Sequence, residues 1–370
     1  MKPEKGFVEK LESSFLSARY WPQLDGLRTV SIAVVLVSHM SDPYIWGFLN
    51  GSMGVTLFFV ISGFLITSLL IREERRRGHI TILQFYTRRA FRILPLYYIA
   101  LSTAAVGVFV FGLGEGPSDF AERLPLLATF NGDLASGGTF VHSWSLGIEE
   151  KFYIAWPFLM FAIPLIKRHR LATASVLLAL ASAAGYIEGA RYFGIYTAIL
   201  AGCVLGLTMH TPRGFKAVSR LARPRVAAVL IPIAVTAYIL DPILPGGYES
   251  GNAHVLFSFS VVLLFPSVIL ATSPLAKVLS WKPFAFLGTR TYAIYLFHPF
   301  CIDVVGMVIP ADQRNVGLAI ARLLLAAALS FGVAEVLARA VEQPLIRMGK
   351  RLTSTPRHAN ASSPSPANEV

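Results

Sequence analysis

Charged residues are scarce in this sequence. Of 370 residues, 15% are Asp, Glu, Lys or Arg, whereas a soluble domain has about 25%. Hydrophobic residues make up 54%, more than is typical of a soluble chain. This composition excludes an ordinary soluble domain and predicts a polytopic membrane protein.

Cysteine is almost absent. Cys203 and Cys301 both fall in apolar runs, which argues against a disulfide framework or a cysteine metal site. No phosphate-binding glycine loop, HExxH zinc helix or GxSxG elbow occurs. We therefore expect no metal and no permanently bound cofactor. No cleavable signal peptide is evident, and the first apolar run is interpreted as a signal anchor.

Apolar runs long enough to span a membrane recur along the chain, separated by charged loops. Runs of this length are helices, because only helices and closed barrels satisfy the backbone within lipid. The predicted fold class is all-α, with about ten transmembrane helices. The ten runs are 27–42, 54–71, 94–113, 146–166, 171–188, 192–210, 226–244, 254–272, 286–309 and 317–341.

Basic residues alternate sharply between the loops. One set of alternate loops holds 27 of the 33 lysines and arginines, and the opposite set holds only Arg123, Arg191 and Arg314. The positive-inside rule then places both termini in the cytoplasm of a multi-pass inner (plasma) membrane protein. The net charge of +12 is thereby explained by topology, and we expect a lipid bilayer rather than nucleic acid as the partner.

Three segments follow from this organisation. Residues 1–23 are predicted to form a cytoplasmic N-terminal segment, and residues 24–345 an integral membrane domain. Residues 346–370 are rich in Ser, Pro and Asn and are predicted to be a disordered cytoplasmic tail.

The first apolar run carries an ionisable residue at each end. Arg28 and His39 lie 11 positions apart (39 − 28), so a helix places them within roughly 20° of one face. The rise is about 16 Å, which sets Arg28 near one membrane surface and His39 deep or towards the other. Such groups are costly in lipid and predict a lined cavity. The alternative is a flanking charge and a hydrogen-bonded helix-end histidine.

Two glutamates begin the fourth run. Glu149 and Glu150 are expected at a depth similar to that of His39. A carboxylate beside an imidazole fixes its tautomer and raises its basicity. Adjacent helix positions differ by about 100°, so one glutamate is assigned to His39 and the other to Arg322 or Lys151. A purely structural network of buried ion pairs is the alternative.

A basic cluster opens the third run. Arg89 and Arg92 share a helical face and, with Arg88 and Arg28, form a candidate cradle for phosphates. Ordinary positive-inside charge is the alternative, and we prefer it for the arginines at 72, 75, 76 and 77.

The ninth run contains a tyrosine-rich stretch that ends at His298, directly before a proline. We interpret His298 as a hydrogen-bonded histidine at a helix kink rather than a catalytic one. Glu335 and Arg339 are spaced as an i,i+4 ion pair. The supporting polar residues of the candidate site are Asp25, Glu150, Arg322, Tyr292 and His298.

Taken together, these residues resemble the acyltransferase-3 family of integral membrane acyltransferases. The resemblance covers about residues 20–345, in the family's order. It rests on Leu24–Arg28 with His39 (the family's Arg-ten-residues-His motif), Gly54–Phe64 (GVTLFFVISGF), Arg89 and Arg92 before Pro95, Trp144–Tyr153 (WSLGIEEKFY) and the run ending at His298.

The resemblance implies an enzyme that moves an acyl group, expected to be acetyl, from cytoplasmic acyl-CoA to a hydroxyl of a cell-envelope carbohydrate. In that scheme Arg28, Arg89 and Arg92 hold the CoA phosphates and the pantetheine arm follows the face from Arg28 to His39. His39 is then the general base, with Glu149 orienting it, although an acyl-histidine intermediate is equally compatible with the sequence.

Two positions depart from the family pattern. Thr56 replaces a usual acidic residue, and Lys151 stands where Gln is common.

Two other functions use the same groups: a transporter, proton-coupled or flipping a lipid-linked sugar, and a non-catalytic membrane sensor. The sequence shows no internal repeat, which many transporters have. The motifs do not distinguish among acceptors or acyl chain lengths.

Overall fold

The computed structural model describes residues 2–40, 49–240, 254–270, 274–310 and 315–353, and every regular element within them is a helix. The first half of the chain forms α1 (Lys2–Ser17), α2 (Pro22–Ser38), α4 (Gly51–Arg77), α5 (Ile82–Phe111), α6 (Pro117–Ala128), α7 (Trp144–Pro157), α8 (Pro164–Arg168) and α9 (Arg170–Ala184). Short 3-10 turns at Gly132–Leu134 and Val141–Ser143 precede α7, and a π-helical turn at Phe158–Ala162 follows it.

The second half is also helical. It forms α10 (Arg191–Gly194), α11 (Thr197–Met209), α12 (Pro212–Val218), α13 (Pro224–Leu240), α14 (Val255–Ile269), α15 (Pro274–Leu279), α16 (Lys282–Gly288), α17 (Thr291–Val308), α18 (Val316–Leu337) and α19 (Gln343–Leu352). A 3-10 turn at Ser219–Ala222 joins α12 to α13, and a π-helical turn at Ala338–Glu342 joins α18 to α19.

Several helices are long and apolar enough to cross a membrane. Five stretches in the described residues qualify: Gly51–Arg77, Ile82–Phe111, Tyr192–Met209, Thr291–Val308 and Val316–Leu352. A sixth arises if the pair Pro212–Ala222 and Pro224–Leu240, bent by 78°, is one span. The chain is thus an all-helical membrane protein. The predicted count of about ten crossings and the cytoplasmic position of both termini are not confirmed and stay predictions.

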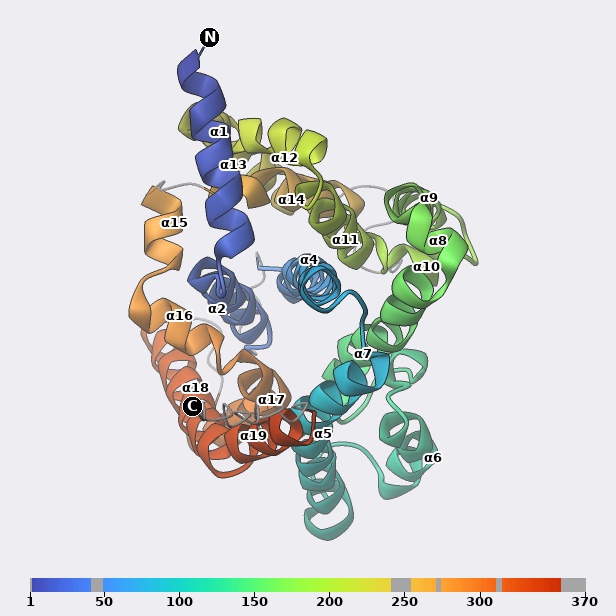
Figure 1. The fold of residues 1–370 in the computed structure, drawn as a ribbon. Coiled ribbons are helices and arrows are strands. Elements are labelled where there is room, and N and C mark those ends of the chain that lie inside the picture. Colours follow the sequence, from blue (N-terminus) through green and yellow to red (C-terminus); the bar gives the residue numbers. More distant parts are fainter. Residues whose placement is uncertain (1, 41–48, 241–253, 271–273, 311–314, 354–370) are drawn as a thin grey trace, which may run out of the picture.

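Helices α2 and α4 form the centre of the molecule, and most other helices surround them (Figure 1). Helix α4 packs against α11, where a Cβ on Gly63 would lie 1.9 Å from the Ile199 carbonyl oxygen. A Cβ on Gly202 of α11 would lie 2.2 Å from the Val60 carbonyl oxygen of α4. Small residues allow membrane helices to approach this closely, so the contact fixes α4 at the centre.

Element boundaries differ from the prediction in several places, including the following four. The first apolar helix begins at Pro22, since proline suits the first helical turn. The ninth run is broken, because α16 ends at Gly288 and α17 starts at Thr291. The predicted N-terminal segment contains the helix α1, and α19 extends helical structure past the predicted boundary at 345 to Leu352. Residues 354–370 of the predicted tail lie outside the described residues.

Candidate functional site

A cavity of about 1480 Å³ lies between the start of α2, the end of α4, the start of α5 and α19. We call it the basic cavity. Its charged lining residues are Arg19, Asp25, Arg28, Arg72, Glu73, Arg75, Arg76, Arg77, Arg88, Arg89, Arg92, Arg290, Glu342 and Lys350. It therefore brings together all four predicted phosphate ligands, and it also holds the arginines at 72–77 that the sequence analysis assigned to topology alone.

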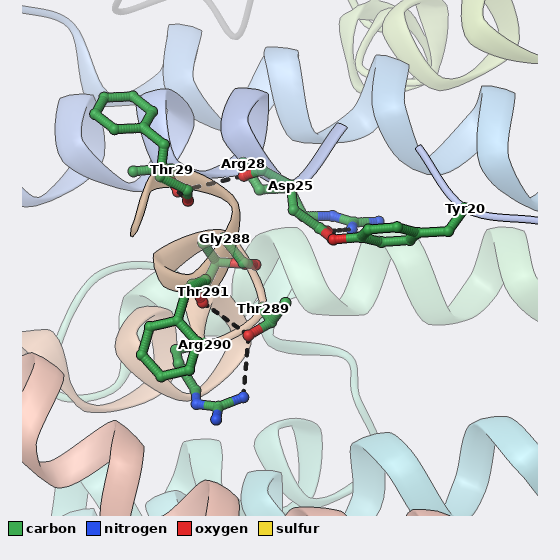
Figure 2. A network of polar contacts seen from close by, with 10 residues as sticks. Tyr20, Asp25, Arg28, Thr29, Gly288, Thr289, Arg290 and Thr291 are labelled. Atoms are coloured by element: carbon green, nitrogen blue, oxygen red, sulfur yellow. Dashed lines mark hydrogen bonds and ion pairs between the residues drawn. The ribbon is translucent and has the colours of Figure 1, made fainter. Parts of the chain in front are cut away.

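Asp25, one of the residues that line the basic cavity, contacts the side chains of Tyr20 and Arg28 (Figure 2). Tyr20 donates its hydroxyl hydrogen to Asp25 Oδ2 at 2.5 Å, and Arg28 donates from Nη1 to Asp25 Oδ1. Partial desolvation, together with the hydrogen bond to Asp25, raises the pKa of Tyr20 to about 12, although more than half of the side chain is exposed. Asp25 is itself buried, so it fixes the position of the Arg28 guanidinium one turn away and neutralises part of its charge.

The turn between α16 and α17 packs directly on this end of α2 (Figure 2). Thr29 donates its hydroxyl hydrogen to the Phe284 carbonyl oxygen at 2.6 Å. A Cβ on Gly288 would lie only 1.8 Å from the Asp25 carbonyl oxygen, so glycine is required there. Arg290 follows in the turn and binds Glu335 of α18 at 2.6 Å. The predicted pair Arg339–Glu335 is confirmed at 2.5 Å.

The arginines of α5 differ in how their charge is compensated. Arg88 forms an ion pair with Glu73 at 3.0 Å. Arg89 lies over the Tyr153 ring at 4.4 Å, and within the described residues no carboxylate forms an ion pair with Arg89 or Arg92. These two neighbouring guanidinium groups form no ion pair in the described residues, and Glu149, Glu150 and Glu342 act on them only at longer range, so this part of the cavity is attractive to a multiply charged anion.

A second, smaller cavity of about 100 Å³ adjoins the basic cavity, and we call it the inner cavity. The two share Arg28, Leu65, Arg89 and Arg92. The polar residues that line the inner cavity come from α2, α4, α5, α7 and α17: Arg28, Ser62, Arg89, Arg92, Ser145, Glu149, Glu150, Tyr153, Thr291, Tyr292 and Tyr295.

The inner cavity contains a hydrogen-bonded group that sequence reasoning missed. Ser62 donates its hydroxyl hydrogen to Glu149 Oε1, and Tyr153 donates its own to Ser62 Oγ at 3.2 Å. Tyr292 donates to the Ile93 carbonyl oxygen at 2.8 Å. Ser62 lies within an apolar run, where a small hydroxyl residue gives no sequence signal of its partner.

The predicted pairing of Glu149 with His39 is wrong. Glu149 binds Ser62 and lines the same cavity as Arg28, whereas His39 does not line that cavity. Helices α2 and α4 pair so that His39 lies beside Gly51, the first residue of α4. Ser62 is eleven residues further along α4 (62 − 51), about 16 Å away, and so lies at the level of Arg28. The carboxylates and the imidazole therefore occupy different depths.

The alternative partners for the second glutamate are also wrong. Glu150 lines the inner cavity, where Arg89 is the charge that acts on it most strongly. Lys151 forms an ion pair with Asp133, which Tyr192 also contacts. Arg322 is 2% exposed, on α18, and lines neither cavity. An error of one residue in the predicted depth of a helix changes every such assignment, because consecutive side chains point about 100° apart around the helix axis.

His39 lies in a cluster of imidazoles. Its Nδ1 is 2.7 Å from the Val35 carbonyl oxygen, so Nδ1 carries the hydrogen and Nε2 is left as the basic nitrogen. The His298 ring packs edge-on at 4.9 Å between centroids, and the His142 ring is 5.6 Å from that of His298. His298 Nδ1 is 2.8 Å from the Tyr295 carbonyl oxygen, which is the backbone contact expected at a helix kink.

His142 was absent from the predicted site. It is buried, its Nε2 donates to the Leu296 carbonyl oxygen at 3.2 Å, and burial lowers its pKa to about 3. It is therefore neutral at physiological pH. Its position just before α7 was the available signal, because it lies a few residues from the two glutamates that were predicted at a depth similar to that of His39. In the described part of the chain, no group of three or more His, Cys, Asp or Glu residues is arranged to hold a metal ion.

The fold and the cavities define a class: a polytopic helical membrane protein with an anion-attracting cavity at one end of its central helix and imidazoles at the other. A family model described as "Acyltransferase domain" matches residues 21–339. The chain belongs to this family, acyltransferase-3, as the motifs predicted.

Curated relatives match over most of this chain. Peptidoglycan O-acetyltransferase OatA of Listeria monocytogenes is 29% identical over 90% of this chain and 57% of its own length. Putative peptidoglycan O-acetyltransferase YrhL of Bacillus subtilis is 31% identical over 76% and 48%. O-acetyltransferase OatA of Staphylococcus aureus is 28% identical over 92% and 59%. The chain thus spans about half the length of these relatives. No solved structure matches the chain.

Proposed function

We propose that this protein is a membrane O-acetyltransferase that transfers an acetyl group from cytoplasmic acyl-CoA to a hydroxyl of a cell-wall polysaccharide. The family and the names of the relatives support the reaction class, and those names suggest peptidoglycan as the acceptor. The donor, the direction of transfer and the plasma membrane location are part of the proposal.

One observation carries the proposal: an arginine-rich cavity adjoins a smaller second cavity at the start of α2, the helix whose C-terminal cap is His39. Arg89 and Arg92, with Arg28 and Arg88 beside them, are suited to the phosphates of CoA. A phosphate at this position would gain ionic hydrogen bonds from guanidinium groups that form no ion pair within the described residues.

His39 is assigned as the general base. Its Nδ1 hydrogen is held by Val35, so Nε2 faces away with a free lone pair that accepts the proton of the acceptor hydroxyl. The oxygen then attacks the thioester carbonyl, and the CoA thiolate leaves. Backbone and imidazole contacts, rather than Glu149, orient the ring.

The test is an incubation of membranes containing the full chain with acetyl-labelled acetyl-CoA and peptidoglycan. The proposal predicts that label accumulates as a base-labile ester on the glycan. Movement of a lipid-linked sugar or of protons without any need for acetyl-CoA would instead identify a transporter. Absence of both activities, in protein that binds acetyl-CoA, would favour a sensor. Either of these results contradicts the proposal.

A further inference from the structure

Near His39, the side-chain amide of Asn50 has its oxygen hydrogen-bonded and its nitrogen without a partner. Asn50 directly precedes α4, and its Oδ1 accepts hydrogen bonds from the Ser52 backbone N–H at 3.0 Å and the Ser52 hydroxyl at 2.6 Å. Because a backbone N–H can only donate, the atom that faces it is the oxygen, which fixes the orientation of the amide. The Asn50 Nδ2 atom is buried, and no described residue accepts its hydrogens. An unpaired buried donor is costly, so these hydrogens are suited to a ligand oxygen.

Contacts from three parts of the chain hold the Asn50 amide in place. Ser52 donates its hydroxyl hydrogen to Asn50, so the Ser52 oxygen accepts from His254 Nε2 at 2.6 Å. The Asn50 backbone N–H donates to the Tyr238 hydroxyl at 2.8 Å, and the Asn50 carbonyl oxygen accepts from the Met53 N–H at 3.1 Å. Tyr238 belongs to α13, and His254 directly precedes α14. The unpaired donor is therefore held in one orientation before any ligand binds.

Asn50 adjoins the His39 end of α2 through the next residue, Gly51. A Cβ on Gly51 would lie 2.2 Å from Ser38 Oγ and 3.7 Å from His39 Cε1, so the start of α4 packs closely on this end of α2. The Cε1 atom of His39 is bonded to both ring nitrogens, and Nδ1 is occupied by the Val35 carbonyl oxygen. The basic nitrogen Nε2 and the start of α4 are therefore neighbours.

Two further polar groups at this place lack partners. The backbone N–H of Gly51 is the first of α4, and no described residue accepts its hydrogen. His298 is fully buried, with its ring packed against His39, and its Nε2 has no partner in the described part of the chain. Unpaired groups from α4 and α17 thus gather around the same imidazole, as is expected where a substrate supplies the missing partners.

The proposed reaction creates an anion close to the base. His39 Nε2 takes the proton of the acceptor hydroxyl, whose oxygen bonds to the thioester carbonyl carbon, and the carbonyl oxygen gains an electron pair. When the C=O bond re-forms, the C–S bond breaks, and the leaving thiolate takes the proton from the imidazolium. The carbonyl oxygen only accepts hydrogen bonds, and fixed N–H donors aimed at it stabilise the charged intermediate.

We infer that Asn50 is a further catalytic residue, whose Nδ2 donates a hydrogen bond to the thioester carbonyl oxygen as that oxygen becomes negatively charged. The Gly51 backbone N–H is the second donor of this oxyanion hole. Ser52 and His254 act through Asn50 and are positioning residues. This inference rests on the proposed function. Asn50 lies outside all the motifs on which the family resemblance rests, and only the fold brings it to His39.

The experiment must separate this role from helix capping, because Asn50 also caps α4. Asp and Ser cap a helix about as well as Asn. Asp offers no hydrogen to an oxyanion, and the Ser hydroxyl ends one bond closer to the backbone. The variants are therefore Asn50→Asp and Asn50→Ser, in the purified full chain. Asn315→Asp is the matched control, because Asn315 caps α18 in the same way, accepting from the Leu318 N–H at 3.0 Å.

Both Asn50 variants are expected to lower kcat for acetyl-CoA about 10²- to 10³-fold, which is the usual effect of removing one oxyanion donor. KM, calorimetric binding of CoA and the unfolding temperature should stay close to wild type, and Asn315→Asp should change none of these quantities. A dithioacetyl-CoA donor replaces the carbonyl oxygen by sulfur, a weak acceptor. With this donor, the difference between wild type and the Asn50 variants should shrink to less than about tenfold.

Wild-type kcat in Asn50→Asp would overturn the inference, since capping alone would then explain the residue. A raised KM with unchanged kcat, a lower unfolding temperature that accounts for the lost activity in both variants, or an equally large rate loss with the two donors would also overturn it. Absence of acetyl transfer from acetyl-CoA by the wild-type protein would instead contradict the proposed function, and this result is distinct from all the others.

Discussion

The two ends of α2 place ionisable side chains in opposite settings. At the Arg28 end, carboxylates, tyrosines and guanidinium groups surround a large cavity, and some of the cations form no ion pair within the described residues. At the His39 end, His39 Nδ1 contacts the Val35 carbonyl oxygen and the Ser38 hydroxyl, and the His298 ring packs against the imidazole, with His142 next to His298. One end is suited to holding an anion and the other to accepting a proton. Each prediction below separates these two roles.

The largest effect is expected from His39→Ala. Loss of a positioned general base should lower the transfer rate about 10²–10⁴-fold. Acetyl-CoA affinity should stay unchanged, because His39 lines neither the basic nor the inner cavity. Steady-state kinetics and equilibrium binding on the same preparation measure both quantities. Wild-type turnover in this variant would remove His39 from the mechanism.

A smaller effect, on acetyl-CoA binding rather than on the transfer rate, is expected from Arg92→Ala. Removal of one charge-assisted phosphate contact, about 1.5–3 kcal/mol, should weaken acetyl-CoA binding about 10- to 100-fold and leave kcat nearly constant. Arg28→Ala should act in the same direction. Affinity equal to wild type in both variants, in titrations of purified protein, would show that the arginines serve topology alone.

Gly288→Ala tests the packing that holds the Arg28 end together. An added Cβ meets the Asp25 carbonyl oxygen at 1.8 Å, so we expect destabilisation of about 1–3 kcal/mol and weaker acetyl-CoA binding. Gly6→Ala in α1 is the control, because nothing lies within 4 Å of its Cβ position. Thermal unfolding of both variants in detergent is the measurement. Equal stability of Gly288→Ala and wild type would mean that α16 does not press on α2 as described.

The smallest effect concerns Tyr20. Its pKa is raised to about 12, so the neutral phenol is favoured in the folded protein. Its contribution to stability is therefore complete below about pH 10 and is lost as the pH rises through about 12. Tyr20→Phe should flatten this part of the stability profile slightly, since the side chain is largely exposed. An unchanged profile between pH 9 and 12 would argue against the contact with Asp25.

The sequence predicted those site residues whose positions depend on the regular geometry of a single helix. Arg28 and His39 are separated by whole turns of one helix, so their positions along α2 follow from helix dimensions alone. Arg88, Arg89 and Arg92 were found because they lie close together at the start of one helix. The sequence did not predict that these residues line one cavity with the arginines of α4, since this depends on how α4 and α5 pack against each other.

Contacts between helices account for the rest. The partner of Glu149 depends on the depth of α7 relative to α2 and α4, and apolar runs define depth only to within several residues. Ser62 and His142 contact residues far along the chain, on α7 and α17, which no local pattern reveals. Tertiary packing, rather than periodicity, thus decides which carboxylate meets which base.

The central claim is that donor and acceptor reach the protein from opposite sides of the membrane. The direct test uses proteoliposomes in which the orientation of the chain has been determined by protease accessibility. Acetyl-CoA is supplied on one side only and the glycan acceptor on the other. The account predicts transfer only when acetyl-CoA is on the side of the basic cavity and the acceptor on the side of His39. Transfer with the two substrates exchanged, or from either side equally, would contradict it.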